Sequence, residues 1–195
     1  IYNDGLITVF AFGGIYDAGT FGFSMEEIMI FAIVLNVTAG IGAFLMGFLD
    51  DYIGSKKTIQ ISNIGLIIAC LIAVLSPNRE LIRYNLPYIG EYIITGKMMF
   101  WVSGVLIGIF SGPNQSASRS LMARFVPQNK VSEFFGFFAF SGKATSFLGP
   151  FLLGYLTQLY GSQRYGVAVV VGFLLIGSII LYFVDEKAGI NASKT

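Results

Sequence analysis

The stretch GPNQSASRSLMARFVPQNKVSEFFGFFAFSGKATSFLGP, residues 112–150, decides the fold. It joins the end of one apolar run to the body of the next, and it places Lys143 among phenylalanine, glycine, alanine and serine residues. In a soluble protein, a lysine can bend its alkyl stem so that the ammonium reaches water. In a bilayer, a lysine within an apolar segment is a pathway residue by default. The composition of the chain decides between these two settings.

The composition is that of a membrane protein. Hydrophobic residues make up 55% of the chain and charged residues 12%, with a mean hydropathy of +0.74, whereas an ordinary soluble domain has about 25% charged residues. The formal net charge of +1 and the scattered basic residues exclude nucleic acid as a partner. With no histidine and the single Cys70, the chain has no means for histidine-dependent catalysis, a paired-cysteine metal site or an intrachain disulfide. We therefore expect neither an enzyme nor a bound metal or cofactor.

Six runs are apolar enough, and close enough to the length of about 20 residues that crosses a bilayer, to be transmembrane helices. They are residues 4–23, 26–49, 57–75, 97–118, 133–158 and 165–184. The sequence thus predicts an all-α polytopic membrane protein, with a six-helix bundle over residues 1–188 and a polar tail over residues 189–195. Because the chain begins at Ile1 without an initiator methionine, we expect it to be part of a longer product.

The basic residues set the expected orientation. One side of the six segments holds seven of them, namely Lys56, Lys57, Arg119, Arg124, Lys130, Lys187 and Lys194. The other side holds four, namely Arg79, Arg83, Lys97 and Arg164. We therefore expect both termini in the cytoplasm, a location in the bacterial inner membrane, and an outer surface loop over residues 76–96.

A short charged loop follows the second segment. Gly47 ends a helix, Asp51 follows four residues later, Gly54 makes a turn, and Lys56 and Lys57 come next. Such a loop can hold two helices in register and offer a carboxylate to a neighbouring helix N-terminus, which favours anions by about 0.3 to 1 kcal/mol. The alternative is a plain helix hairpin with solvated charges.

This loop resembles the signature GxxxD(R/K)xG(R/K)(R/K) of the major facilitator superfamily. The match keeps the glycines, the acid and Lys56, but Tyr52 and Ser55 stand where the signature has basic residues. The fuller resemblance is to the "unknown major facilitator" family, which includes vacuolar autophagy-related effluxers. It is carried by YNDG (2–5), FAFGGIY (10–16), LDDYIGSKKTI (49–59), NQSASRSLMARFVP (114–127), EFFGFFAFSGKA (133–144) and LGP (148–150).

The resemblance implies the C-terminal half of a twelve-helix solute transporter. The partners would be the lipid bilayer, a small solute such as an amino acid, and a second six-helix half that is either the missing N-terminal part or another copy of this chain. The first and fourth segments would line a central cavity, the second and fifth would border the other half, and the third and sixth would lie outside. Transport would proceed by alternating access, as symport or efflux.

Polar residues inside the segments are the candidate pathway residues. Leaving a lysine charged in hydrocarbon costs about 3 kcal/mol, so Lys143 needs water, an acid or a substrate anion nearby. Asp17 and Asp4 are the acids of the chain that can serve, and proton coupling through such a pair is one hypothesis. The remaining candidates are Asn36, at a similar expected depth, and Asn114 and Gln115, which follow Pro113. The alternatives are that Lys143 pairs structurally between the two halves and that Asp17 only reaches toward the outer surface.

Charged residues near the predicted cytoplasmic surface suggest an inner gate. In this hypothesis Asp50 or Asp51 meets Arg124, or the N-terminus of the fifth segment near Glu133, when the inner side closes. Arg119 belongs to the same cluster. The alternative is the ordinary excess of positive charge on the cytoplasmic side.

A different class of function also fits the sequence. The chain could be a non-transporting structural or assembly subunit of a larger membrane complex. Its polar residues Lys143, Asn36 and Gln115 would then be covered by a helix of another protein.

Overall fold

A computed structural model describes residues 2–76, 82–86 and 90–193, apart from the side chains of Asp17 and of residues 82–86 and 90–94. The helices are α1 (Tyr2–Tyr16), α2 (Met25–Ile53), α3 (Ser55–Leu75), α4 (Gly96–Phe125), α5 (Val131–Ala144), α6 (Leu148–Tyr160), α7 (Gln163–Tyr182) and α8 (Glu186–Ala192). The π-helix η1 (Asp17–Phe21) continues α1, and the 3-10 turn η2 (Gln128–Lys130) precedes α5.

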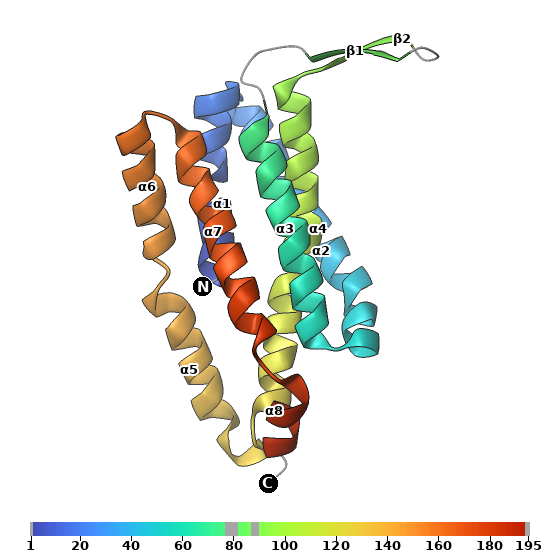
Figure 1. Cartoon of the computed structure of the whole chain (residues 1–195), viewed down its shortest axis with the longest axis vertical. Coiled ribbons are helices and arrows are strands. Elements are labelled where there is room, and N and C mark those ends of the chain that lie inside the picture. The colour runs from blue at the N-terminus through green and yellow to red at the C-terminus, as the bar shows by residue number, and fades with distance from the viewer. Residues whose placement is uncertain (1, 77–81, 87–89, 194–195) are drawn as a thin grey trace.

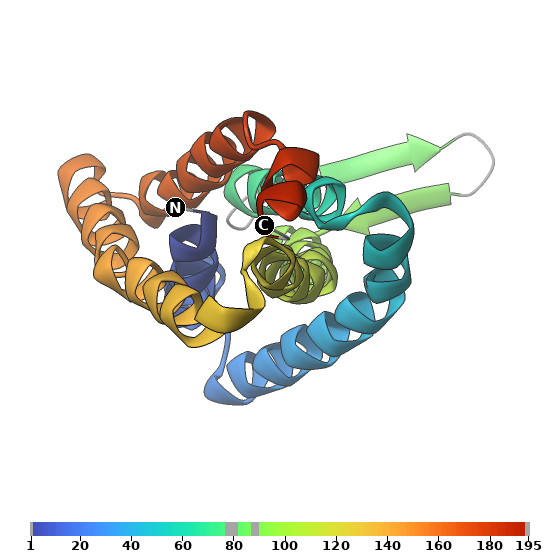
Figure 2. The same cartoon turned by 90° about the horizontal axis from the view of Figure 1, so that it is seen from below.

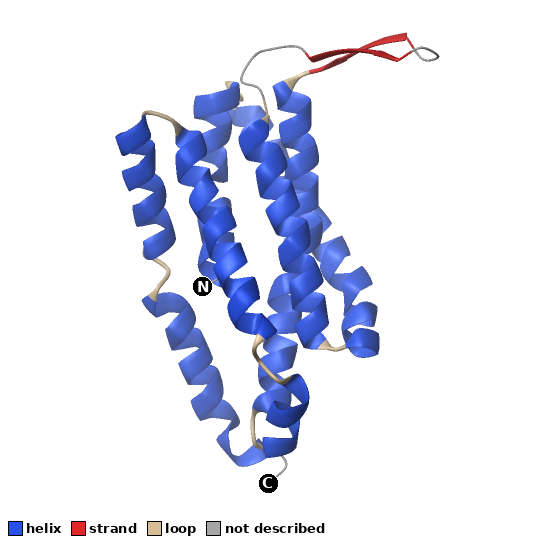
Figure 3. Cartoon of the chain, in the orientation of Figure 1, coloured by secondary structure: helices blue, strands red, loops and turns tan. Residues whose placement is uncertain are grey.

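The long helices run side by side and reverse direction at each connection, with α1 and η1 forming one rod and α5 and α6 another (Figure 1). Seen from the α8 end, α1 and α4 lie between α2 on one side and the α5–α6 rod on the other, and α3 and α7 line a third side, at the top of the view (Figure 2). The predicted all-α membrane fold is confirmed. The structure also contains a hairpin of two antiparallel strands, β1 (Ile82–Leu86) and β2 (Gly90–Ile94), which projects from the bundle where the outer surface loop was expected (Figure 3).

In the described part of the chain, three helices are long and apolar enough to cross a membrane, namely α2, α3 and α7. Their bounds lie close to the predicted segments 26–49, 57–75 and 165–184. The helix α4 is long enough but less apolar, and it runs on beyond the predicted end at residue 118. The helices α1, α5 and α6 are individually shorter and reach span length only as the two composite rods.

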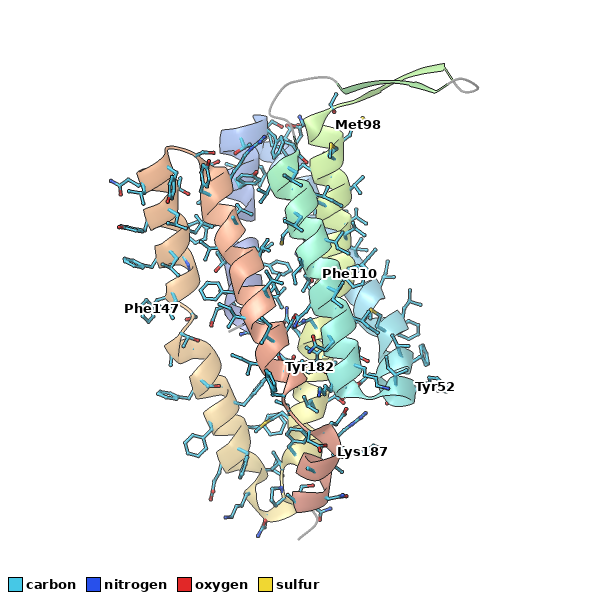
Figure 4. The ribbon with its side chains drawn as sticks, viewed as in Figure 1. Tyr52, Met98, Phe110, Phe147, Tyr182 and Lys187 are labelled. Carbon is cyan, nitrogen blue, oxygen red and sulfur yellow. The ribbon has the colours of Figure 1, made fainter. Side chains whose placement is uncertain are left out.

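The predicted continuous helix over 133–158 is wrong, because the rod breaks at residues 145–147 between α5 and α6 (Figure 3). Pro150 has no backbone N–H and its ring crowds the carbonyl four residues earlier, at Ser146, so it favours a break at this point. Pro150 instead lies in the first turn of α6, where proline is tolerated. Figure 4 shows Phe147 pointing away from the bundle at this break.

The end of the chain also differs from the prediction of a polar tail over 189–195. Residues up to Ala192 form α8, which packs on the end of α4. The carboxylate of Asp185 caps α8 by accepting hydrogen bonds from the backbone N–H groups of Lys187 and Ala188, at 2.9 and 3.0 Å. This local cap explains why a polar segment is helical.

Small residues let α2 and α4 approach closely. A Cβ atom added at Gly108 would overlap the hydroxyl of Thr38, and one at Gly112 would overlap the carbonyl of Ala39. In the other direction, a Cβ at Gly42 would overlap the carbonyl of Ile109. Small residues on facing helices commonly allow such contacts in membranes.

The carbonyl of Ile109 is available for this contact because of Pro113. In a regular helix the N–H of residue 113 would donate to the carbonyl of residue 109, and proline has no N–H. Gly42 brings its backbone against that carbonyl, so α2 covers the oxygen that has no N–H partner at residue 113.

Aromatic side chains hold the bundle together at the end opposite α8. The ring of Phe100 from α4 lies 4.7 Å from that of Phe21 and 5.2 Å from that of Phe31, measured between centroids. Phe31 also meets Trp101 edge to face at 5.2 Å. Such pairs add about 0.5 to 1.5 kcal/mol each beyond the burial of their area.

We predict that Gly42→Ala destabilises the protein by about 1 to 3 kcal/mol, because the new methyl group would force α2 away from the Ile109 carbonyl. Thermal unfolding of the purified protein in detergent measures the effect. Gly40→Ala is the matched control, since a Cβ at Gly40 has no described atom within 4 Å. Equal midpoints for the two variants would contradict the close contact.

Candidate functional site

A cavity of about 710 Å³ lies between the start of α1, the C-terminal half of α4 and α5. None of the residues of α5, all of which are described, is buried, so one side of this helix is free to face the cavity. Three polar residues named from the sequence line it, namely Gln115, Arg119 and Lys143. The rest of the lining is Tyr2, Asn3, Ile7, Ser118, Phe135, Phe138, Ala139, Ser141, Gly142 and Thr145.

Lys143 lies in the last turn of α5, just before the break in the rod. A helix C-terminus carries a partial negative charge, which stabilises a nearby cation by about 0.3 to 1 kcal/mol. In the part of the chain that the structure describes, the ammonium has no ion pair, and no carboxylate belongs to the described lining of the cavity. The cavity therefore combines two cationic groups, Lys143 and Arg119, with an apolar wall that includes Phe135 and Phe138.

Asp4 sits beside the cavity and is buried. One of its carboxylate oxygens accepts a hydrogen bond from the hydroxyl of Thr145 at 2.8 Å, and its backbone carbonyl accepts one from Thr8 at 2.7 Å. Gly149 at the start of α6 packs against Thr8 and the Asp4 carbonyl so closely that no Cβ would fit. Asp4 thus fixes the α5–α6 break against α1, two residues from Lys143.

Besides Asp4, the predicted pathway residues Asn114, Asn36 and Asp17 do not belong to the described lining of the cavity. Asn114 is buried, and its side-chain amide donates to the side-chain oxygen of Asn63 on α3 at 2.6 Å. Its position one residue before Gln115 turns it toward α3 instead of α5. Asn36 is exposed on α2, where its amide donates to the Ala32 carbonyl of the same helix at 2.8 Å. Asp17 begins η1, and its side chain lies outside the described part.

A charged cluster closes the α8 end of the bundle. The guanidinium of Arg124, in the last turn of α4, lies 3.7 Å from a carboxylate oxygen of Asp50 and 3.8 Å from one of Asp51. It also lies 3.8 Å from an oxygen of Glu186 on α8. All three distances exceed those of hydrogen bonds, so the guanidinium is shared electrostatically among three carboxylates.

The loop between α2 and α3 is built into this cluster. Gly54 has a φ of +91°, and a Cβ there would lie 3.1 Å from a carboxylate oxygen of Glu186, so backbone conformation and space both favour glycine. The same carboxylate accepts a hydrogen bond from the N–H of Ser55 at 3.1 Å. Lys56 donates to the carbonyls of Tyr182 and Val184 at 2.8 and 2.6 Å, which ties α3 to the end of α7.

The other residues predicted to form the gate do not belong to this charged cluster in the described structure. Gly47 is half-buried, with no described atom within 4 Å of an added Cβ. Lys57 and Glu133 are exposed, and Arg119 lines the cavity instead of joining the cluster.

The sequence did not single out Glu186, because it lies just beyond the last predicted transmembrane segment, which ends at residue 184, and its partner Ser55 is distant in sequence. A local sequence pattern does indicate the helix that carries Glu186, because the acidic pair Asp185 and Glu186 directly follows an apolar segment and is typical of a helix N-terminus. Across residues 2–76, 82–86 and 90–193, no group of three or more cysteine, aspartate or glutamate side chains could hold a metal ion.

We predict that Asp50→Asn lowers the free energy of unfolding by about 1 kcal/mol, because it removes the best buried carboxylate beside Arg124. The side chain of Asp50 is 11% exposed and that of Asp51 is 84% exposed. Asp51→Asn is therefore the matched control, with an expected change near zero, since solvent screens its charge. Thermal unfolding compares the two variants, and a larger loss for Asp51→Asn would refute this assignment.

The family described as "Vacuole effluxer Atg22 like" matches residues 1–194 of the chain. A Bacillus subtilis protein named "Uncharacterized MFS-type transporter YxiO" is 26% identical over 193 residues, which cover 99% of this chain and 41% of that protein. "Autophagy-related protein 22" of Cryptococcus neoformans is 26% identical over 188 residues, covering 96% of this chain and 34% of that protein. No solved structure matches the chain.

The chain therefore spans less than half the length of these two relatives. The match nevertheless runs along nearly the whole chain, through both the cavity and the charged cluster. The chain belongs to the Atg22-like vacuole effluxer family of the major facilitator superfamily.

Proposed function

We propose that this chain is one half of a membrane transporter and moves a small solute by alternating access against a second six-helix half. Family membership supports the transporter class. Large apolar side chains exposed on α2 and α5, such as Phe44, Phe48 and Phe137, offer surface that lipid or a second half can cover. Orientation is part of the proposal, with the α8 end and both termini in the cytoplasm, and the bacterial inner membrane as the location.

The cavity with Lys143 and Arg119 is the observation that carries the proposal. Two cations without an acid in the described lining favour a solute with a negative group. The rings of Phe135 and Phe138 suit an apolar body on the same solute. A solute with a carboxylate and an aliphatic or aromatic side chain meets both conditions, and an amino acid is one such solute.

Proton coupling belongs to the same proposal. Asp4 is held by Thr145 two residues from Lys143, so a proton that binds the Asp4 carboxylate changes the field at the ammonium. Uptake driven by a pH gradient would support this coupling. Uptake that does not depend on pH would exclude it.

The second half is either the remaining part of a longer protein or another copy of this chain. The native mass of the gently solubilised particle separates these arrangements. A mass near twice that of this 21.2 kDa chain with no other protein indicates two copies. A large assembly of many chains, without uptake, would favour a structural subunit instead.

We predict that leucine and its deaminated analogue 4-methylpentanoate both bind the complete transporter, whereas leucinamide, which has the ammonium but no carboxylate, does not. Lys143→Met should weaken binding of both acids by about tenfold or more, since a charge-assisted contact in a partly dry site is lost. Uptake by proteoliposomes and competition with labelled leucine measure the effect.

Lys130→Met is the matched control, because Lys130 is exposed before the start of α5 and is not part of the described lining. Binding of leucinamide with no binding of 4-methylpentanoate would refute an anion site. Tight binding of leucine alone would show that the other half supplies an acid for the ammonium.

A further inference from the structure

The hydroxyl of Ser118 on α4 has one hydrogen, and a backbone carbonyl fixes its direction. The hydroxyl oxygen of Ser118 lies 2.6 Å from the carbonyl oxygen of Asn114. A carbonyl can only accept a hydrogen bond, so the Ser118 hydrogen lies between these two oxygens. Without a hydrogen between them, two oxygens at this distance would repel each other. Ser118 therefore donates to Asn114 and can only accept from a second hydroxyl group.

The direction of the Ser118 hydrogen in turn fixes the hydrogen of Tyr2. The hydroxyl oxygen of Tyr2 lies 2.8 Å from that of Ser118. Since Ser118 has no second hydrogen to donate, the hydrogen in this contact belongs to Tyr2. The Tyr2 oxygen has then given its only hydrogen and keeps lone pairs that can accept a hydrogen bond. The chain of hydrogen bonds thus runs from Tyr2 through Ser118 to the Asn114 carbonyl.

The Tyr2 hydroxyl lies at the wall of the cavity in a fixed position. Both partners of the hydroxyl pair, Tyr2 and Ser118, belong to the described lining. The side chain of Tyr2 is packed against α7, because a Cβ atom added at Gly177 would lie only 2.7 Å from the Cβ of Tyr2. A group that is already held in its binding position costs less to order when a ligand arrives.

This oxygen complements the two cations of the cavity. Lys143 and Arg119 can only donate hydrogen bonds, and no carboxylate belongs to the described lining. Within residues 2–76, 82–86 and 90–193, the Tyr2 hydroxyl makes a hydrogen bond to Ser118 and to no other group. The hydroxyls of Ser141 and Thr145 also donate within the protein. These two residues lie within two positions of Lys143, however, where the charge of the ammonium disfavours a second cation.

We infer that Tyr2 determines specificity by accepting a hydrogen bond from a donor group of the solute, which is the ammonium in an amino acid. The inference rests on the proposed function, in which Lys143 and Arg119 bind the carboxylate of the same solute. A solute with a hydrogen-bond donor beside its carboxylate is then preferred over the same acid without one. An acid with an acceptor at that position is disfavoured, because its lone pairs would meet those of the Tyr2 oxygen.

The test measures equilibrium binding of four acids to the complete transporter in detergent. The acids share the side chain of leucine and differ only at the carbon beside the carboxylate. This carbon carries an ammonium in leucine, a hydroxyl in 2-hydroxy-4-methylpentanoate, an oxo group in 4-methyl-2-oxopentanoate and only hydrogens in 4-methylpentanoate. Leucine should bind about tenfold tighter than 4-methylpentanoate, the effect of a hydrogen bond from a charged donor. The hydroxy acid should bind about five-fold tighter than the oxo acid.

Tyr2→Phe removes the oxygen and keeps the ring against Gly177. It should weaken the binding of leucine about tenfold, leave that of 4-methylpentanoate unchanged and make the hydroxy and oxo acids equal. Tyr155→Phe is the matched control, because Tyr155 is exposed on α6 and lies outside the described lining, so its affinities should equal those of the parent. If Tyr2→Phe weakened all four acids alike, the role of Tyr2 would be structural and the inference would be overturned.

Thermal unfolding shows whether Tyr2→Phe is folded. If it is not, the parent protein decides, since equal binding of the hydroxy and oxo acids would overturn the inference. Binding needs no transport, so a parent that shows the expected order of affinities but no uptake would contradict the proposed function and leave the role of Tyr2 intact. Uptake of leucine without any difference among the four acids would do the reverse.

Discussion

The structure depends on the placement of α4. Its middle is packed against α2 by the close contacts at Gly108 and Gly112, and the ring of Phe110 packs against Gly65 of α3. Its C-terminal half carries Arg119 into the cavity and Arg124 into the charged cluster. One helix therefore connects the packed part of the bundle with both the cavity and the charged cluster. A movement of α4 would change the geometry of each.

The two ends of the bundle are held by different forces. Aromatic rings around Phe100 hold the end near the hairpin, and their attraction does not depend on ionic strength. The α8 end is held by carboxylates around one guanidinium at distances near 3.8 Å, which salt and solvent weaken. The end near the hairpin also has the short ion pair between Lys97 and Glu27, at 2.5 Å, so the α8 end differs from it in relying on longer ion pairs around Arg124.

Much of this arrangement follows from local sequence, and the rest does not. Lys143, Gln115 and Arg119 stood out because charged and polar groups are costly in an apolar segment, and Asp50 and Arg124 because they flank short loops. Asn114 was misplaced because sequence does not reveal the rotation of a helix about its axis, and one residue is a rotation of about 100°. Glu186 was missed because its partner Ser55 is distant in sequence. The break before α6 was predictable from Pro150, which the hydropathy pattern conceals.

The contact between Gly42 and the carbonyl of Ile109 has an evolutionary consequence. Pro113 has no N–H to bond the Ile109 carbonyl, and a side chain at position 42 would occupy the space next to that carbonyl. A substitution at either position alone should lower the stability of the protein. A residue with an N–H at position 113 would hydrogen-bond the Ile109 carbonyl within α4 and leave a gap beside Gly42. The two positions are therefore epistatic, and substitutions at them in homologous proteins should covary although they lie 71 residues apart.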